Sequence, residues 1–324
     1  MKIFITRLVP KSGLKLLKEA GIEYDFYDSN YAIPRAKFID ILKKNSYDAI
    51  LSTLTDKIDS EILDAAGEQL KIVANYAVGY GNIDLDECTK RGIAVSNTPD
   101  VLSAATADMA FALLLATARK IIEGHELIQN DQWLGWTPTE LLGQDLSFKT
   151  LGIIGMGRIG EEMAKRALGF NMKVVYYNRS PKPQAEKELG VEYSGLNELL
   201  AQSDFISLHC PLTPETKHLI GKKEFELMKE NAIIINTARG AVINERELVN
   251  ALKQNQIWGA GLDVFEYEPK ITEELKHIPN VVLAPHLGSA TKGTRDAMLE
   301  LSLKSIIAVL NNKTTANILN KGSI

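Results

Sequence analysis

The chain has 324 residues, of which 45% are apolar and 24% charged. This length suits about two domains, and the composition excludes a disordered, collagen-like or fibrous protein. With 37 basic and 41 acidic side chains, the formal charge of −4 gives no general attraction to phosphate backbones or anionic lipid. We therefore expect neither nucleic acid nor a membrane as partner.

Cysteine content and apolar run length indicate an intracellular protein. Cys88 and Cys210 form neither a disulfide framework nor a CxxC signature. The N-terminal segment lacks the apolar core and cleavage site of a signal peptide and is typical of a first strand. The longest apolar run, Met109 to Ala118, is shorter than the roughly 18 residues that cross a bilayer. These features predict a cytoplasmic location.

In the first hundred residues, short β-rich runs alternate with helical stretches. The β-rich runs are KIFIT, AILST and KIVANYAV, and the helical ones SGLKLLKEAG and SEILDAAGEQ. This alternation is typical of βαβ units around a parallel sheet. A buried helix is predicted from Val101 to Arg119, because the segment has little polar face. Residues 124–149 have poor periodicity, and Trp133 and Trp136 in this arm suggest an interface between two subunits of a homodimer.

A second βα rhythm begins at Thr150. Its strand-like runs are LGIIG, KVVYYN, FISLHC, AIIINTA, GAGLDV and NVVLAPH. The run from Thr294 to Leu310 has helical spacing, and we expect it to return to the first lobe and place the active cleft between the lobes. The predicted fold is α/β, with two Rossmann-like or flavodoxin-like lobes, parallel sheets and a discontinuous first lobe. Residues 1–100 and 288–324 form the expected substrate domain, and 101–287 the dinucleotide-binding domain.

A glycine-rich segment follows the strand TLGII and opens a helix, which is the context of a dinucleotide fingerprint. Gly155 permits the tight turn, Gly157 lets a pyrophosphate approach the backbone, and Gly160 lets the helix lie close to the sheet. The intervening residues Met156, Arg158 and Ile159 complete the predicted phosphate-binding loop. Free N–H groups and the positive helix end would face the phosphates.

The end of the next predicted strand bears on the choice of cofactor. An NAD site usually places a carboxylate there, whereas this chain has Asn178, Arg179 and Ser180. These side chains can donate to or pair with a 2′-phosphate, so we predict a preference for NADP(H), with NAD(H) possible. The alternative is that Arg179 is a solvated surface residue and either cofactor is accepted.

Three ionisable residues stand just beyond predicted strand ends: Arg239, Glu268 and His286. Ligands bind at the carboxyl ends of strands in open α/β sheets. Arg239 can hold a substrate carboxylate and polarise a keto oxygen, and His286 can donate a proton near neutral pH. Glu268 would favour the imidazolium and orient its ring. Each residue alone also has a purely structural explanation in a turn or loop.

Several longer motifs resemble the D-isomer-specific 2-hydroxyacid dehydrogenase family, in particular its glyoxylate and hydroxypyruvate reductase branch. They are NYAVGYGNID, LGIIGMGRIG, DFISLHCPLTPET, INTARG, GLDVFEYEP and APHLGSAT, and together they span nearly the whole chain. In that family the arginine, glutamate and histidine of the ARG, EP and PH motifs are catalytic. The resemblance therefore assigns these roles to Arg239, Glu268 and His286.

The resemblance also implies contacts that spacing does not give. Val78 and Gly79 would form a backbone cradle for the substrate carboxylate, with Leu54 nearby, and Trp136 would reach the substrate site across a dimer interface. Asp263 would hold the carboxamide of the nicotinamide. Further cofactor contacts implied by the family are Thr106, Pro211, Thr237, Ala238 and Gly288.

The sequence thus predicts an enzyme that reduces a small 2-keto acid, such as glyoxylate or hydroxypyruvate, to the D-2-hydroxy acid. One alternative is a nucleotide-sensing protein similar to the NAD(H)-binding corepressors. Another is a related dehydrogenase acting on phosphoglycerate or 2-ketogluconate. We expect no metal site, since His209 and Cys210, placed on one strand, would point to opposite faces.

Overall fold

The computed structural model describes residues 1–321 and divides into two compact units. Among the described residues, unit 1 comprises 1–102 and 290–321, and unit 2 comprises Ser103–Ser289. Each unit contains its own parallel sheet flanked by helices. The predicted fold class, with a discontinuous first lobe, is confirmed.

The sheet of unit 1 has the strand order β2-β1-β3-β4-β5, with parallel pairing throughout. Its strands are β1 (Lys2–Ile5), β2 (Glu23–Phe26), β3 (Ala49–Ser52), β4 (Ile72–Asn75) and β5 (Ala94–Ser96). Its helices are α1 (Lys11–Glu19), α2 (Arg35–Lys44), α3 (Ser60–Ala66), α4 (Leu85–Lys90) and α12 (Lys292–Leu310).

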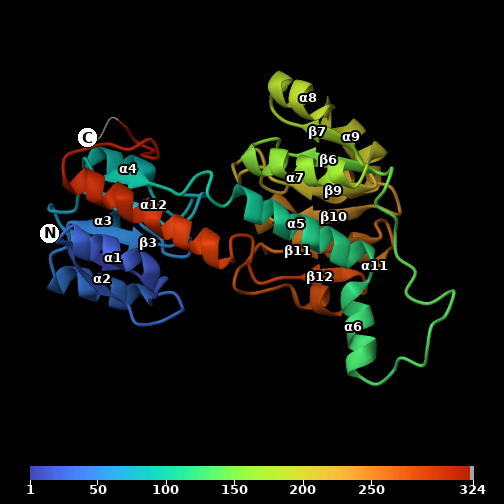
Figure 1. Cartoon of the computed structure of the whole chain (residues 1–324), viewed down its shortest axis with the longest axis horizontal. Coiled ribbons are helices and arrows are strands. Elements are labelled where there is room, and N and C mark those ends of the chain that lie inside the picture. Colours follow the sequence, from blue (N-terminus) through green and yellow to red (C-terminus); the bar gives the residue numbers. More distant parts are fainter. Residues whose placement is uncertain (322–324) are drawn as a thin grey trace. The chain divides into compact units, whose positions relative to one another are not determined.

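Both faces of this sheet are covered by helices. Phe4, Ile50 and Val73 from successive strands pack against apolar side chains of α2, α3 and α4. Helix α12 packs along α1 (Figure 1) and also contacts β4, so the C-terminal part of the chain completes unit 1. The approach is close at Gly13, where an added Cβ would lie 2.6 Å from Leu299. The apolar strands are therefore buried on both sides, as expected for a parallel sheet.

The sheet of unit 2 has the strand order β12-β11-β10-β9-β6-β7-β8. Its strands are β6 (Thr150–Ile154), β7 (Lys173–Tyr177), β8 (Glu192–Tyr193), β9 (Phe205–Leu208), β10 (Ile233–Asn236), β11 (Gly259–Leu262) and β12 (Val281–Leu283). Its α-helices are α5 (Ser103–Ala118), α6 (Ile121–Gln129), α7 (Arg158–Gly169), α8 (Pro183–Leu189), α9 (Leu196–Gln202), α10 (Lys222–Leu227) and α11 (Glu245–Lys253). Two 3₁₀ segments within residues 1–321 are η1 (Gly240–Val242) and η2 (Glu273–His277).

Alternate side chains of each central strand of unit 2 enter different cores. Ile233 and Ile235 of β10 pack on the side of α5 and α7, whereas Ile234 packs on the side of α9, α10 and α11. This alternation follows from the pleat, which points successive side chains to opposite faces. Two buried cores therefore hold the carboxyl ends of β6, β9, β10, β11 and β12 at one edge of a rigid sheet.

Two local predictions were wrong. Helix α6 covers residues 124–129 of the arm expected to be irregular, whereas residues 130–149 form no helix or strand; none of the α6 residues is buried, so the helix lacks the buried face that periodicity detects. Strand β9 ends at Leu208, so His209 and Cys210 lie in the segment after it and do not alternate across a strand as predicted. None of the helices within residues 1–321 combines the length and apolar character needed to cross a membrane.

Candidate active site

Three side chains predicted from the sequence lie after neighbouring strands of unit 2. Arg239 follows β10, Glu268 follows β11 and His286 follows β12. His286 Nδ1 and Glu268 Oε2 are 2.9 Å apart, within hydrogen-bonding distance. The other ring nitrogen of His286, Nε2, has no hydrogen-bond partner within residues 1–321.

The environment of Glu268 keeps it ionised. Burial raises the pKa of this carboxyl, but the hydrogen bond and charge of His286, the Phe265 N–H and the Arg239 charge outweigh burial, and the net pKa lies below its usual value. Phe265 N donates to Glu268 Oε1 at 3.0 Å, so both carboxylate oxygens are held. A carboxylate fixed in this way orients an imidazole and stabilises its protonated form.

His286 stands on a turn that a buried carboxylate supports. Its φ of 57° lies in the left-handed region, which non-glycine residues rarely adopt and which recurs at functional sites. Asp263, only 1% exposed, accepts from Leu287 N at 2.6 Å and Gly288 N at 2.7 Å. Burial raises the pKa of Asp263 against these hydrogen bonds. Asp263 thus supports the turn, a structural contact that the sequence analysis did not predict.

Arg239 is held by the turn that follows β10. Buried Asn236 donates from Nδ2 to the Arg239 carbonyl and accepts from Ala238 N, both at 3.0 Å. Arg239 Nη1 donates to the Ala238 carbonyl at 2.7 Å. Burial lowers the pKa of Arg239, and the negative charge of Glu268 opposes that effect. A guanidinium remains charged in proteins, so this edge of the sheet presents a desolvated cation.

The segments carrying Arg239 and Glu268 are packed directly on each other. A Cβ added to Gly240 would lie 1.8 Å from the carbonyl carbon of Phe265 and 2.3 Å from Glu266 N. Glycine is therefore required at this position. The contact couples the position of the guanidinium to that of the carboxylate.

The glycine-rich loop joins β6 to α7 as predicted. Gly155 has a φ of 102°, and an added Cβ would lie 2.5 Å from Cys210 N, so only glycine fits. Gly160 packs against the Gly155 carbonyl, whereas the space beside Gly157, the N-cap of α7, is open. Arg158 and Ile159 begin the helix. A helix N-terminus with open space beside its first N–H groups fits a pyrophosphate.

Asn178 links the end of β7 to this loop. Its Oδ1 accepts from Met156 N at 3.0 Å, which fixes the side-chain amide beside the fingerprint. Arg179 and Ser180 follow at exposed positions. Hydrogen bonds with Thr213 and with the backbone of Glu215 lower the pKa of the Glu215 carboxyl, and the charge of Arg179 lowers it further. Residues 178–180 carry no acid to hold a ribose 2′-hydroxyl.

The other predicted cofactor contacts lie along this edge of unit 2. Thr106 of α5 adjoins Gly288, whose added Cβ would lie 3.3 Å from Thr106 Cγ2. Thr237 has a buried Oγ1 for which residues 1–321 offer no hydrogen-bond partner. Pro211 lies after β9, and its carbonyl accepts from Thr216 Oγ1 at 2.6 Å. An unpaired buried hydroxyl at the strand edge, together with the open glycine loop, fits a dinucleotide ligand.

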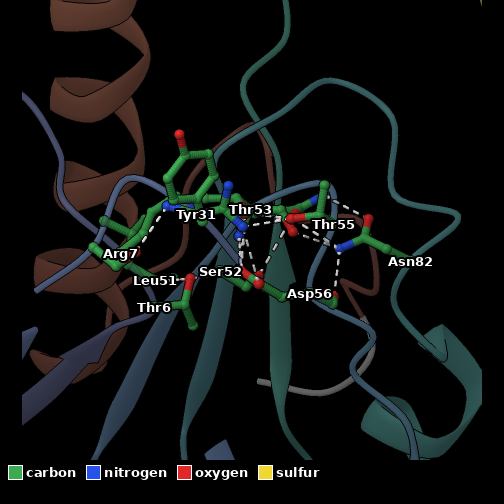
Figure 2. A network of polar contacts seen from close by, with 11 residues as sticks. Thr6, Arg7, Tyr31, Leu51, Ser52, Thr53, Thr55, Asp56 and Asn82 are labelled. Carbon is green, nitrogen blue, oxygen red and sulfur yellow. Dashed lines mark hydrogen bonds and ion pairs between the residues drawn. The ribbon is translucent and has the colours of Figure 1, made fainter. Parts of the chain in front are cut away.

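The residues predicted to contact substrate through unit 1 follow β3 and β4. Leu54 is half-buried in the loop Thr53–Asp56, and Val78 and Gly79 are half-buried after β4. Asp56 Oδ2 accepts from Thr53 N at 2.7 Å and Thr6 Oγ1 at 2.5 Å, and Arg7 pairs with Oδ1 at 3.2 Å (Figure 2). The Leu54 loop is therefore fixed by buried polar contacts.

Trp136 lies in the arm that follows α6 and is 84% exposed. Within residues 1–321, Trp136 makes no hydrogen bond and no ring contact. His209 was predicted to be a packing residue. Its Nε2 lies 2.8 Å from Ser207 Oγ, and burial lowers the pKa of His209 to about 3. Neutral His209 and buried Cys210 form one wall of the Gly155 turn.

The fold and site together define a class: a dinucleotide-binding α/β protein with a histidine–carboxylate pair and a desolvated arginine at its strand ends. Residues 111–288 match the family model described as D-isomer specific 2-hydroxyacid dehydrogenase, NAD binding domain. The chain belongs to this family, and the resemblance drawn from its motifs is confirmed. It is an NAD(P)-dependent dehydrogenase of this family and uses a nicotinamide cofactor.

Relatives match over nearly the full chain. A glyoxylate reductase of Thermococcus litoralis is 52% identical over 324 residues, covering 99% of this chain and 97% of the relative. A crystal structure of a glyoxylate reductase from Paecilomyes thermophila has a TM-score of 0.88 at 34% identity, covering 99% of both chains. An NADPH-dependent glyoxylate/hydroxypyruvate reductase from Sinorhizobium meliloti, in complex with NADP and malonate, has a TM-score of 0.85 at 31% identity, covering 100% of this chain and 98% of that one.

Proposed function

We propose that this protein reduces glyoxylate or hydroxypyruvate to the D-2-hydroxy acid. The observation that carries the proposal is the 2.9 Å contact between His286 and Glu268 beside the Arg239 guanidinium. The names of the relatives point to the same small keto acids. The bound nicotinamide would supply the hydride to the keto carbon.

The side chains have separate tasks in this proposal. His286 donates a proton from Nε2 to the keto oxygen, and in the reverse direction accepts it. Glu268 holds the ring by Nδ1 and balances its positive charge. Arg239 pairs with the substrate carboxylate and polarises the keto oxygen. Val78, Gly79 and Leu54 of unit 1 contact the carboxylate end of the substrate.

The fingerprint Gly155 to Gly160 would hold the pyrophosphate. Thr106, Pro211, Thr237, Ala238, Asp263 and Gly288 would contact the remainder of the cofactor. Asp263 has both oxygens engaged by the His286 turn, and each oxygen has a second lone pair for the nicotinamide carboxamide.

We propose that NADP(H) is preferred over NAD(H). Asn178 and Ser180 can donate to a 2′-phosphate, and Arg179 can pair with it. The variant Asn178→Asp keeps an oxygen that can accept from Met156 N but places a negative charge where the phosphate would bind. It should lower kcat/KM for NADPH about 10-fold or more while sparing NADH. A clear NADH preference of the unmodified protein contradicts the proposal.

We propose a homodimer formed through α6 and the arm that follows. This segment exposes a concentration of large apolar side chains, which is typical of a protein–protein interface. They are Ile121, Ile122, Ile128, Trp133, Leu134, Trp136, Leu141, Leu142 and Phe148. Trp136 would reach the partner's substrate site. Light scattering should give twice the chain mass, and Leu134→Asp should reduce it to the chain mass. A monomeric unmodified protein contradicts this assembly.

The activity test is the loss of absorbance at 340 nm with purified protein, each reduced cofactor and a panel of keto acids. We expect turnover of glyoxylate and hydroxypyruvate to exceed that of phosphorylated or six-carbon keto acids. Cofactor binding without turnover of any panel member would instead favour a nucleotide-sensing protein.

A further inference from the structure

The carbonyls of Val78 and Gly79 are both held by buried side-chain amides. Asn97 Nδ2 donates to the Val78 carbonyl at 2.8 Å, and Asn75 Nδ2 donates to the Gly79 carbonyl at 2.8 Å. Asn75 is completely buried and Asn97 is 7% exposed, whereas Val78 and Gly79 are half-buried. The carbonyls of this loop therefore face the interior of unit 1.

Fixing these carbonyls also fixes the N–H groups of the next residues. In a planar trans peptide the C=O of one residue and the N–H of the following residue point in opposite directions. The Gly79 and Tyr80 N–H groups must then point away from the two amides. Within residues 1–321, the N–H groups of Val78, Gly79 and Tyr80 have no hydrogen-bond acceptor. The loop thus presents unpaired donors on its outward side.

Further hydrogen bonds prevent the side-chain amide of Asn75 from rotating by 180°. Its Nδ2 also donates to Asn82 Oδ1 at 3.1 Å, and its Oδ1 accepts from Ser52 Oγ at 3.3 Å. Asn82 in turn donates to the carbonyls of Thr53 at 3.1 Å and Asp56 at 3.0 Å (Figure 2). The Gly79 peptide and the Leu54 loop therefore share one fully hydrogen-bonded network, which fixes both.

Asn97 is fixed from the C-terminal part of the chain. Asn317 Nδ2 donates to the Asn97 carbonyl at 2.7 Å, and Asn317 Oδ1 accepts from Thr315 Oγ1 at 2.7 Å and Ser305 Oγ at 3.1 Å. Ser305 belongs to α12. The orientation of the Val78 peptide therefore depends on residues more than 200 positions further along the chain.

We propose that Asn75 and Asn97 are positioning residues that turn the Gly79 and Tyr80 N–H groups toward the substrate carboxylate. This inference rests on the proposed function and deepens it, because it names the residues that orient the two N–H donors. Neutral amides suit the task, because they hold the carbonyls without placing a charge behind the anion site. Hydrogen bonds from N–H groups to a carboxylate are charge-assisted and stronger than neutral ones.

Carboxylate binding and turnover are measured separately in the test. Calorimetry gives the affinity of the NADPH-loaded protein for oxamate, a carboxylate that is not reduced, and a 340 nm assay gives KM and kcat for glyoxylate. The variants are Asn75→Ala and Asn97→Ala. The control is Asn320→Ala, since Asn320 is also buried in unit 1 and donates to a backbone carbonyl, that of Ile93, at 2.9 Å.

We expect each variant to weaken oxamate binding and raise the glyoxylate KM about 10-fold or more, with NADPH affinity unchanged and kcat changed less than KM. Asn320→Ala should lose similar stability and keep wild-type oxamate affinity. Asn75→Asp is a second variant of the same shape, whose carboxylate repels the Gly79 carbonyl; it should also weaken oxamate binding.

Unchanged oxamate affinity in all variants overturns the inference, as does an equal loss in Asn320→Ala, because the effect would then be general destabilisation. An unmodified protein that binds no oxamate also overturns it. A protein that binds oxamate through Asn75 and Asn97 but reduces no keto acid supports the inference while contradicting the proposed function.

Discussion

The two units place different chemistry at the carboxyl ends of their strands. In unit 1 the groups behind the Val78–Gly79 loop are neutral amides, Asn75 and Asn97, that act on peptide groups. In unit 2 the strand ends carry ionisable side chains, among them Glu268 and His286, in direct contact. From this difference we predict that unit 1 variants mainly change KM, whereas unit 2 variants change kcat, with a change of KM as well where Arg239 is replaced.

The largest expected effect is that of His286→Ala in unit 2. Removal of a positioned proton donor should lower kcat about 100- to 10,000-fold, while the fingerprint keeps its affinity for NADPH. Steady-state kinetics and NADPH fluorescence titration measure the two effects. The matched control is His277→Ala, since His277 is exposed and lies 3.4 Å from Glu273. A kcat near that of the control contradicts the assignment of His286.

Asp56→Ala tests whether unit 1 is held together as rigidly as its network indicates. It leaves Arg7 without its buried carboxylate partner, removes the acceptor of Thr53 N and removes one of the two acceptors of Thr6 Oγ1, so the free energy of unfolding should fall by about 3 kcal/mol. Urea denaturation measures this value. Asp40→Ala, which breaks an exposed pair with Lys44, should cost less than about 1 kcal/mol. Equal losses in the two variants would contradict the difference in burial.

Arg239→Lys should affect binding and chemistry together. A lysine cannot reproduce the planar fork, so KM for the keto acid should rise and kcat fall, each about 10-fold. The same kinetics on Arg246→Lys, an exposed arginine of α11, provide the control. If Arg239→Lys changes KM alone, the guanidinium binds the carboxylate without polarising the keto oxygen.

Much of the fold could be predicted from the sequence, because buried parallel strands are continuous apolar runs. The short edge strand β8, Glu192–Tyr193, is exposed and gives no such signal. Helix α6 was missed because its apolar residues Ile121, Ile122 and Ile128 are exposed instead of packed on a core. Periodicity detects burial within one chain, and these elements have little of it.

The residues of the candidate site could be predicted from the sequence to different degrees. Arg239, Glu268 and His286 are chemically distinctive and follow apolar runs, so their positions suggested their chemistry. Asn75 and Asn97 also follow or end strands, β4 and β5, but asparagine is common in turns and its side-chain direction decides its role. Their position at strand ends is a signal that sequence analysis could use in other chains of this fold.

The smallest expected effect concerns the pH dependence of stability. Although burial raises the pKa of Glu268, His286, the Phe265 N–H and Arg239 lower it further, so the folded value lies below that of the unfolded chain, about 4.3. The ionised carboxyl therefore stabilises the fold above pH 4.3, and this stabilisation is lost as pH falls through the lower folded pKa.

Glu268→Gln removes this contribution, which is at most about 1 kcal/mol for a partly exposed pair. Thermal unfolding from pH 3 to pH 7 should show the variant less stable than the wild type at neutral pH, with the difference narrowing below pH 4.3. A difference that stays constant over this range would mean that Glu268 acts through packing and shape, and that the charge of the histidine–carboxylate pair does not set the stability of unit 2.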